Sequence, residues 1–238
     1  LGIAKAALSA GAKIYENSAA TSYKVLENHV RVNTKNGSIK ADRIVLACNG
    51  YLGNLEKSLT SKILPMNNYI VATKPLDDET VQKINPKDIA FADSRFVINY
   101  FRMSADKRLL FGGGENYSQE LSKNIVPIVT RPLEKIYPFL KGIKIDYAWG
   151  GKLAITMNRL PFFASLHNEK VISAQGYSGQ GVALASYSGK IVSEKITGTG
   201  EVFDIMSKIP RPSFPGGRFL RNPSMKIGML YYSLLDRI

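Results

Sequence analysis

Residues 173–190, SAQGYSGQGVALASYSGK, place Gly176, Gly179 and Gly181 between a strand pattern and a helix pattern. The strand pattern begins at residue 170, and small residues at helical spacing follow Gly181. A turn of this kind leaves the first helical N–H groups unpaired at the positive end of the helix dipole. The stretch therefore predicts a strand–turn–helix unit whose turn stabilises an anion or an electron-rich carbonyl. Three glycines alone do not identify a ligand, and an ordinary glycine-rich turn before a packed helix is the alternative.

The composition is that of a folded globular protein. Of 238 residues, 45% are hydrophobic and 21% charged, and the longest apolar runs are too short to cross a bilayer. The net charge of +13 comes from scattered lysines and arginines, so a solvated basic surface is expected and nucleic-acid binding is not. A basic module that binds nucleic acid or anionic lipid remains a rival hypothesis. The single cysteine, Cys48, excludes an internal disulfide framework and predicts a cytoplasmic protein.

The order of patterns predicts a mixed fold, α/β with α+β character. Residues 1–62 suggest a helix at 2–10, an extended run at 13–16, a hairpin around Asn36-Gly37, and a strand at 44–48 buried on both faces. Residues 63–158 read as an antiparallel sheet inserted into that first unit. Residues 159–208 return to the first unit, and 209–238 form a tail interrupted by prolines and glycines.

Five stretches, in order, resemble a known family. Residues 172–198 (ISAQGYSGQGVALASYSGKIVSEKITG) resemble the flavin-contacting segment of FAD-dependent amine and amino-acid oxidoreductases of the D-amino-acid oxidase, glycine oxidase and sarcosine oxidase type. Residues 41–53 (ADRIVLACNGYLG), 107–116 (KRLLFGGGEN) and 149–165 (WGGKLAITMNRLPFFAS) are similar to further elements of that family. Residues 214–238 resemble the tail of gamma-glutamylputrescine oxidoreductases in particular.

The resemblance implies a fold and an activity. The fold is an incomplete FAD-binding Rossmann-like domain with an inserted antiparallel-sheet substrate domain. The implied reaction oxidises an amine or amino acid by hydride transfer to flavin N5, followed by hydrolysis of the imine. FAD is expected to be held noncovalently, and no side chain is required as a catalytic acid or base. Gamma-glutamylputrescine is the expected substrate, with sarcosine or a D-amino acid second, and oxygen or a respiratory carrier accepts the electrons. A non-catalytic scaffold or subunit of the same family is the alternative.

The resemblance also assigns site residues. The backbone amides of Gly179, Gln180 and Gly181 would face the flavin N1–C2=O edge, and the family often has histidine where this chain has Gln180. Ala20 would meet the adenine, and Asn49 and Gly50 the ADP portion. The complete set of expected cofactor-binding residues is Ala20, Asn49, Gly50, Gly176, Tyr177, Ser178, Gly179, Gln180, Gly181 and Val182.

The substrate side is expected to include Tyr100, Arg102 and Trp149, since aromatic walls exclude water and Arg102 could clamp a carboxylate. Packing in the sheet, or a surface position for Arg102, is an equally favoured interpretation. Arg159 is interpreted as structural, and Cys48 as a core thiol rather than a covalent flavin link.

Several motifs are absent from the sequence. No G-x-G-x-x-G follows a strand pattern, and in the family this element precedes the part that starts here. We therefore expect a fragment that retains FAD weakly by itself. His29 and His167 are isolated, so no metal site is expected. The basic, aromatic tail could touch an anionic membrane weakly, but packing on the domain surface is favoured.

Overall fold

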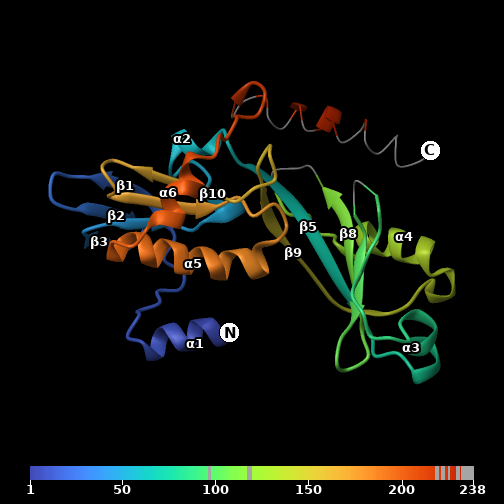
Figure 1. The fold of residues 1–238 in the computed structure, drawn as a ribbon. Coiled ribbons are helices and arrows are strands. Elements are labelled where there is room, and N and C mark those ends of the chain that lie inside the picture. The colour runs from blue at the N-terminus through green and yellow to red at the C-terminus, as the bar shows by residue number, and fades with distance from the viewer. Residues whose placement is uncertain are drawn as a thin grey trace.

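The computed structural model describes residues 1–95, 98–116, 120–217, 220, 223–224, 226–228 and 231. Its strands form three sheets, of order β1-β2-β3, β10-β11-β4 and β6-β7-β8-β5-β9 (Figure 1). The strands are β1 (Ala20–Val25), β2 (Val30–Thr34), β3 (Ser38–Ala41), β4 (Ile44–Leu46), β5 (Leu64–Thr73), β6 (Phe91–Ala92), β7 (Tyr100–Met103), β8 (Leu109–Asn116), β9 (Ile145–Ile155), β10 (Phe162–Leu166) and β11 (Val171–Gln175). The helices are α1 (Gly2–Ser9), η1 (Asn49–Tyr51), α2 (Lys57–Thr60), α3 (Asp78–Ile84), α4 (Val126–Ile136), η2 (Pro138–Leu140), α5 (Gly181–Thr197) and α6 (Glu201–Lys208).

The small mixed sheet joins distant parts of the sequence. β11 pairs in parallel with β4, with Val171 opposite Ile44, and antiparallel with β10. α5 and α6 cover one face of this sheet, where Ile172 packs with Ile191 and Phe203 in a buried cluster. The predicted hairpin at Asn36-Gly37 is confirmed by the antiparallel pairing of β2 with β3.

Two local predictions are wrong. The run at 44–48 is not a strand buried on both faces, because it ends at Leu46 and the Val45 side chain is 40% exposed. The Val45 side chain lines the cavity between β4 and α5, so this face of the strand is not covered. The extended run at 13–16 is not a strand either; the first strand begins at Ala20.

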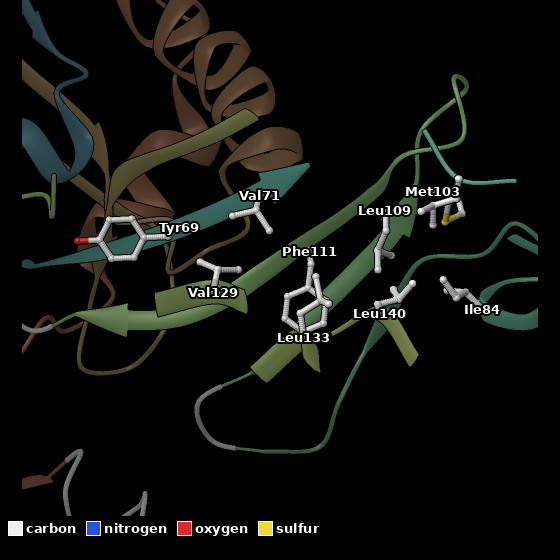
Figure 2. Packing of buried hydrophobic residues seen from close by; sticks show 10 residues of the cluster. Tyr69, Val71, Ile84, Met103, Leu109, Phe111, Val129, Leu133 and Leu140 are labelled. Carbon is white, nitrogen blue, oxygen red and sulfur yellow. The ribbon is translucent and has the colours of Figure 1, made fainter. Parts of the chain in front are cut away.

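The five-stranded antiparallel sheet has two different faces. The residues of one face pack against α4 in a core that includes Tyr69, Val71, Phe111, Val129 and Leu133, all fully buried (Figure 2). Because side chains alternate along strands, the neighbouring residues of β5, β7 and β9 point to the opposite face. β5 and β9, the longest paired strands, run from this sheet to the mixed sheet (Figure 1).

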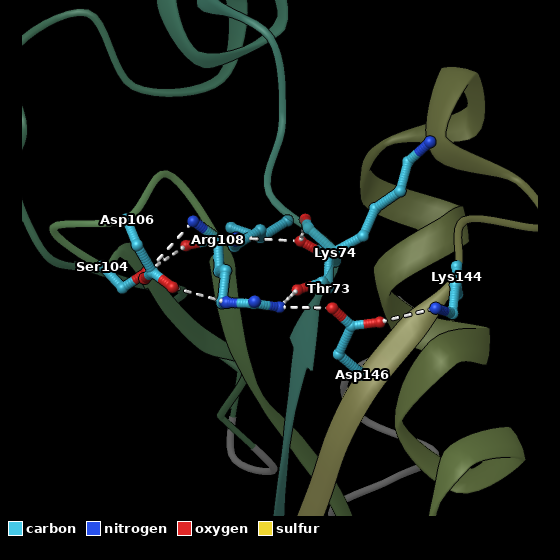
Figure 3. Close-up of polar contacts among 8 residues, drawn as sticks. Thr73, Lys74, Ser104, Asp106, Arg108, Lys144 and Asp146 are labelled. Atoms are coloured by element: carbon cyan, nitrogen blue, oxygen red, sulfur yellow. Dashed lines mark hydrogen bonds and ion pairs between the residues drawn. The ribbon is translucent and has the colours of Figure 1, made fainter.

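An ion-pair network joins the end of β5 at Thr73 to the start of β9 at Asp146 (Figure 3). The Arg108 guanidinium contacts the carboxylates of Asp106 and Asp146, each at 2.6 Å, and donates to the Thr73 carbonyl oxygen at 2.9 Å. The hydrogen bond from Arg108 lowers the pKa of Asp146. The network therefore ties the β7–β8 hairpin to both β5 and β9.

The domain boundaries at residues 62, 158 and 208 stay predictions. In the described part of the chain, no helix is both long and apolar enough to span a bilayer. The predicted membrane contact of the tail falls largely on residues outside that part, but Phe214 packs against the buried cluster of Leu64, Met66 and Ile155. Arg211 is buried and donates to the Pro161 carbonyl oxygen at 2.6 Å, which also anchors the start of the tail.

Candidate functional site

The glycine-rich turn between β11 and α5 adopts left-handed backbone conformations. The φ angles are +75° at Gly176, +52° at Ser178 and +96° at Gly179. The Ser178 N–H donates to the Ala154 carbonyl oxygen at 2.9 Å, and the Ser178 hydroxyl accepts from the Thr156 N–H at 3.3 Å. These bonds fix the turn against the end of β9, and α5 begins at Gly181 as the sequence predicts.

The turn borders open space at Gly179. Within the described residues, the N–H groups of Gly179, Gly181 and Val182 have no hydrogen-bond acceptor, and the first backbone bond of α5 runs from Leu184 N–H to the Gln180 carbonyl at 3.2 Å. A Cβ built on Gly179 would meet no atom within 4 Å. A row of unpaired donors at a helix start, with free space before it, suits the electron-rich edge of a planar ligand.

Asn49 and Gly50 lie beside this turn. The Asn49 side-chain oxygen accepts from the Gly176 N–H at 3.2 Å, so it connects the end of β4 with the end of β11. A Cβ on Gly50 would lie 2.6 Å from the Lys152 carbonyl oxygen, so only glycine permits the close approach of η1 to β9. Cys48 is half-buried against the core around Leu46, and burial raises the pKa of its thiol.

The turn separates two cavities. One, of about 350 Å³, is lined by Asn49, Tyr177 and Gly181 together with residues of β4 and α5. The other, of about 290 Å³, lies between the turn and the open face of the antiparallel sheet. We call this second cavity the sheet cavity; it is lined by Met66, Asn68, Ile98, Tyr100, Leu153, Ile155, Arg159, Ser178, Gly179 and Gln180.

Tyr100 reaches the sheet cavity by lying across a glycine. It pairs with Gly112 on β8, and a Cβ on Gly112 would lie 2.1 Å from the Tyr100 ring. The Tyr100 hydroxyl donates a hydrogen bond to the Asn68 side-chain oxygen on β5. Gly112 thus provides the space that lets the Tyr100 ring extend over one strand to the next.

Trp149 and Arg102, the other two predicted substrate residues, differ in position. The register Tyr100–Gly112–Ile70–Trp149 places Trp149 in the same row of the open face. Trp149 lines a neighbouring cavity of about 270 Å³ with Tyr51 and Asn68. Arg102 shares the face with Tyr100 but lines none of these cavities, and its Nε donates to the Met103 carbonyl oxygen at 3.2 Å.

Ala20, the residue predicted at the adenine, begins β1 at an exposed position and lines none of the cavities. The Val182 side chain is 97% exposed, so only its backbone can contribute to a site at the turn. Asn68, Tyr51 and Arg159 also line these cavities, and the sequence analysis did not predict them as site residues. Asn68 could have been found from its spacing of two from Met66 and Ile70, but only with the strand register known.

The fold and the turn together are typical of one class of protein, the nucleotide-cofactor oxidoreductases: a glycine-rich strand–turn–helix unit lies beside an antiparallel sheet. The family model described as FAD dependent oxidoreductase (DAO) matches residues 1–195. The chain belongs to this family, and FAD is the cofactor of the family. The unpaired N–H groups of Gly179 and Gly181 and the open space at Gly179 fit the edge of a flavin ring.

Curated relatives are similar over the whole chain. This chain is 39% identical over 237 residues to the probable oxidoreductase OrdL of Rhizobium meliloti; the match covers 100% of this chain and 55% of that protein. It is 36% identical over 229 residues to the gamma-glutamylputrescine oxidoreductase of Escherichia coli, covering 96% of this chain and 53% of that protein. The chain therefore spans about half the length of these relatives.

Solved structures share the fold. Glycine oxidase from Geobacillus kaustophilus superimposes with a TM-score of 0.64 at 21% identity, covering 81% of this chain and 51% of that one. L-proline dehydrogenase from P. horikoshii gives 0.65 at 24% identity, covering 87% of this chain and 55% of that one. The predicted mixed α/β architecture with an antiparallel sheet is confirmed.

Proposed function

We propose that this chain supplies the ring-binding turn and the substrate wall of an FAD-dependent amine oxidoreductase. The observation that carries the proposal is the position of the unpaired N–H groups of Gly179 and Gly181, because Gly179 lines the sheet cavity and Gly181 lines the cavity beside β4 and α5. Tyr100 and Trp149 would contribute to the substrate wall, whereas Arg102 would remain at the surface of the sheet.

FAD, when bound, supplies a two-electron acceptor that takes a hydride from the carbon next to the amine nitrogen. The backbone donors of the turn and the dipole of α5 would stabilise negative charge at the ring edge. Asn49, through its bond to Gly176, would hold the turn in place for that contact.

The sheet cavity would select the neutral amine. Its apolar wall of Met66, Leu153 and Ile155 disfavours an ammonium group, and the positive charge of Arg159 acts in the same direction. None of the residues known to line it is aspartate, glutamate or histidine, so the amine proton would leave to solvent before the substrate is oriented. The contribution of these residues is orientation and exclusion of water.

Gamma-glutamylputrescine is the proposed substrate, with sarcosine or a D-amino acid second. The Escherichia coli relative that carries this substrate in its name supports the first choice. Oxygen or a respiratory carrier would take the electrons, and the single cysteine supports a cytoplasmic setting. The first test is anaerobic bleaching of the yellow protein, expressed from its complete reading frame, by gamma-glutamylputrescine. A colourless protein contradicts the proposal.

The turn itself is tested by a pair of glycines at the two ends of α5. Gly179 (φ +96°) and Gly198 (φ +99°) have nearly the same left-handed conformation, and a Cβ at either would meet no atom within 4 Å. Gly179→Val and Gly198→Val should therefore lose similar stability, while only Gly179→Val loses bound FAD. FAD content, measured by absorbance after desalting, decides the matter; equal retention in both variants refutes the assignment of the turn.

A further inference from the structure

We propose that one face of the β1-β2-β3 sheet docks on an anionic lipid membrane. This inference goes beyond the proposed function and does not depend on flavin binding. The sheet lies at the opposite end of the molecule from α3 and α4 (Figure 1). Its inner face packs on the core through Tyr23 and Val25. Because side chains alternate along a strand, the residues between these positions form an outer face.

A row of three cations crosses this outer face. Lys24 on β1 lies opposite Arg31 on β2, and Arg31 lies opposite Lys40 on β3. All three residues are exposed. Neighbouring strands are about 4.8 Å apart, so the backbone positions of the row span roughly 10 Å. The outer face therefore presents three positive charges close together.

The row lacks a counter-charge. Residues 20–41 contain four cations and one carboxylate, that of Glu27 between β1 and β2. None of the ion pairs between described residues involves Lys24, Arg31 or Lys40. Like charges that lie directly opposite each other on a sheet destabilise it. An anionic partner would offset this repulsion.

The positive potential of the row also acts on His29, the residue before β2. Burial and, after it, the positive charges of Lys40, Arg31 and Lys170 lower the pKa of this imidazole. Lys170 donates to the Leu26 carbonyl oxygen at 2.8 Å, which holds its ammonium group beside the turn between β1 and β2. Cations from separate parts of the chain thus converge on this end of the sheet.

The row ends at a cavity of about 450 Å³ beside β1. Lys24 lines this cavity together with Lys57 and His167. A carboxylate, Glu56, also lines it, but this group is occupied, since it accepts hydrogen bonds from the Ser58 N–H at 2.9 Å and from the Ser58 hydroxyl at 2.6 Å. The phosphate of a lipid headgroup would contact the ammonium groups of Lys24 and Lys57 here.

The composition of the outer face favours a membrane over a nucleic acid. Its residues are Ser22, Lys24, Arg31, Asn33, Ser38 and Lys40. None of these described residues is aromatic or apolar, whereas single-stranded nucleic acids bind largely by stacking on aromatic rings. The major groove of a duplex accepts a helix or a two-stranded ribbon, and a three-stranded sheet is neither. An anionic membrane surface needs only exposed cations, and the cytoplasmic leaflet carries a negative surface potential.

The test measures binding of the protein, expressed from its complete reading frame, to lipid vesicles by flotation. Equimolar phosphatidylglycerol–phosphatidylcholine vesicles should bind it at low salt, and pure phosphatidylcholine vesicles should not. Each Lys or Arg near an anionic surface raises the partition coefficient roughly fivefold. Arg31→Gln should therefore lower the coefficient about fivefold, and a row variant with Lys24→Gln, Arg31→Gln and Lys40→Gln together should lower it about 100-fold.

The matched control, a distal variant, removes three exposed lysines near α3, α4 and η2 by Lys87→Gln, Lys123→Gln and Lys141→Gln together. Both triple variants lose the same charge, so only the row variant should lose binding. Because Arg31→Gln relieves two repulsions, its melting temperature should not fall, and lost docking is thereby distinguished from lost folding.

Equal losses of binding in the row variant and the distal variant would overturn the inference, since attraction would then depend on net charge alone. Absence of binding to the anionic vesicles at low salt would overturn it as well. Retention on duplex DNA that is lost in the row variant alone, without vesicle binding, would assign the outer face to nucleic acid instead. The bleaching of the FAD-loaded protein by an amine is measured separately, so the proposed function is tested independently of these results.

Discussion

Gly112→Ala tests the cross-strand arrangement that brings Tyr100 to the sheet cavity. A Cβ at this position would lie 2.1 Å from the Tyr100 ring, whereas ordinary van der Waals contacts begin near 3.4 Å. The ring must therefore move by more than 1 Å, and the hydrogen bond from its hydroxyl to Asn68 is lost. Removing the ring itself should abolish this penalty.

The magnitude follows from two contributions. Overpacking of this kind costs about 1–3 kcal/mol, and loss of the hydrogen bond costs about 0.5–1.5 kcal/mol. We therefore expect Gly112→Ala to lower the free energy of unfolding by roughly 2–4 kcal/mol. With Tyr100→Ala in the background, the same change should stabilise the protein by about 0.5–1 kcal/mol, because glycine within a strand is costly relative to alanine.

Denaturant unfolding of the four proteins in this double-mutant cycle measures both numbers. The fluorescence of Trp149, the only tryptophan of the sequence, reports on the same row of the sheet. A change of sign between the two backgrounds is the expected result. Additive effects, equal with and without the Tyr100 ring, would refute the arrangement of Tyr100 over Gly112.

Two further changes have defined outcomes. Arg108→Met should lower the melting temperature at pH 7 but have little effect near pH 2. The pKa of Asp146 is lowered in the folded state, so its stabilising effect is present above the ordinary carboxyl pKa and is lost as pH falls through the folded-state value. Melting temperatures of the two proteins that differ by the same amount at every pH would contradict the pairing. Gly176→Ala should lower the free energy of unfolding by about 1–3 kcal/mol more than Gly142→Ala, measured by chemical unfolding. Both glycines have φ of +75°, but only a Cβ at Gly176 would crowd a neighbour, the Thr156 side chain at 2.7 Å. Equal costs would mean that the turn is less tightly packed than the structure indicates.

Local signals in the sequence predicted the elements that depend on neighbouring residues. Gly181 starts a helix, and Asn36-Gly37 closes a hairpin, because turn chemistry is set by a few adjacent residues. The exposure of Val45 was not predictable in this way, since it depends on what covers that face of β4, where Val45 lines the cavity beside α5. Burial of an apolar run is a property of the whole sheet, which a short pattern does not contain.

In the candidate site, too, residue types were predictable from the sequence, whereas the positions that depend on strand pairing were not. Tyr100 and Trp149 were identified by residue type, but their common row requires the register of β8, β5 and β9, which is set by pairing over many residues. Arg159, interpreted as structural, lines the sheet cavity, and its sequence neighbours Asn158 and Leu160 indicate only a turn. The Thr156–Ser178 contact brings that turn beside the glycine-rich one, and no local pattern in the sequence predicts this contact.

Three non-glycine residues around the site, Asn49, Arg159 and Ser178, have left-handed φ angles of +48°, +60° and +52°. Each follows the end of a different strand, β4, β9 or β11, and two direct contacts join the three turns, Asn49 to Gly176 and Thr156 to Ser178. Left-handed conformations cost about 1–3 kcal/mol each at such residues, and this energy must come from packing elsewhere in the fold. Because β4 and β11 pair in parallel and β9 ends beside the glycine turn, the sheets themselves bring these strained turns to one place. The site is thus formed by strand ends whose positions are fixed by two separate ladders, which is why substitutions within either ladder should change the binding of FAD and substrate together.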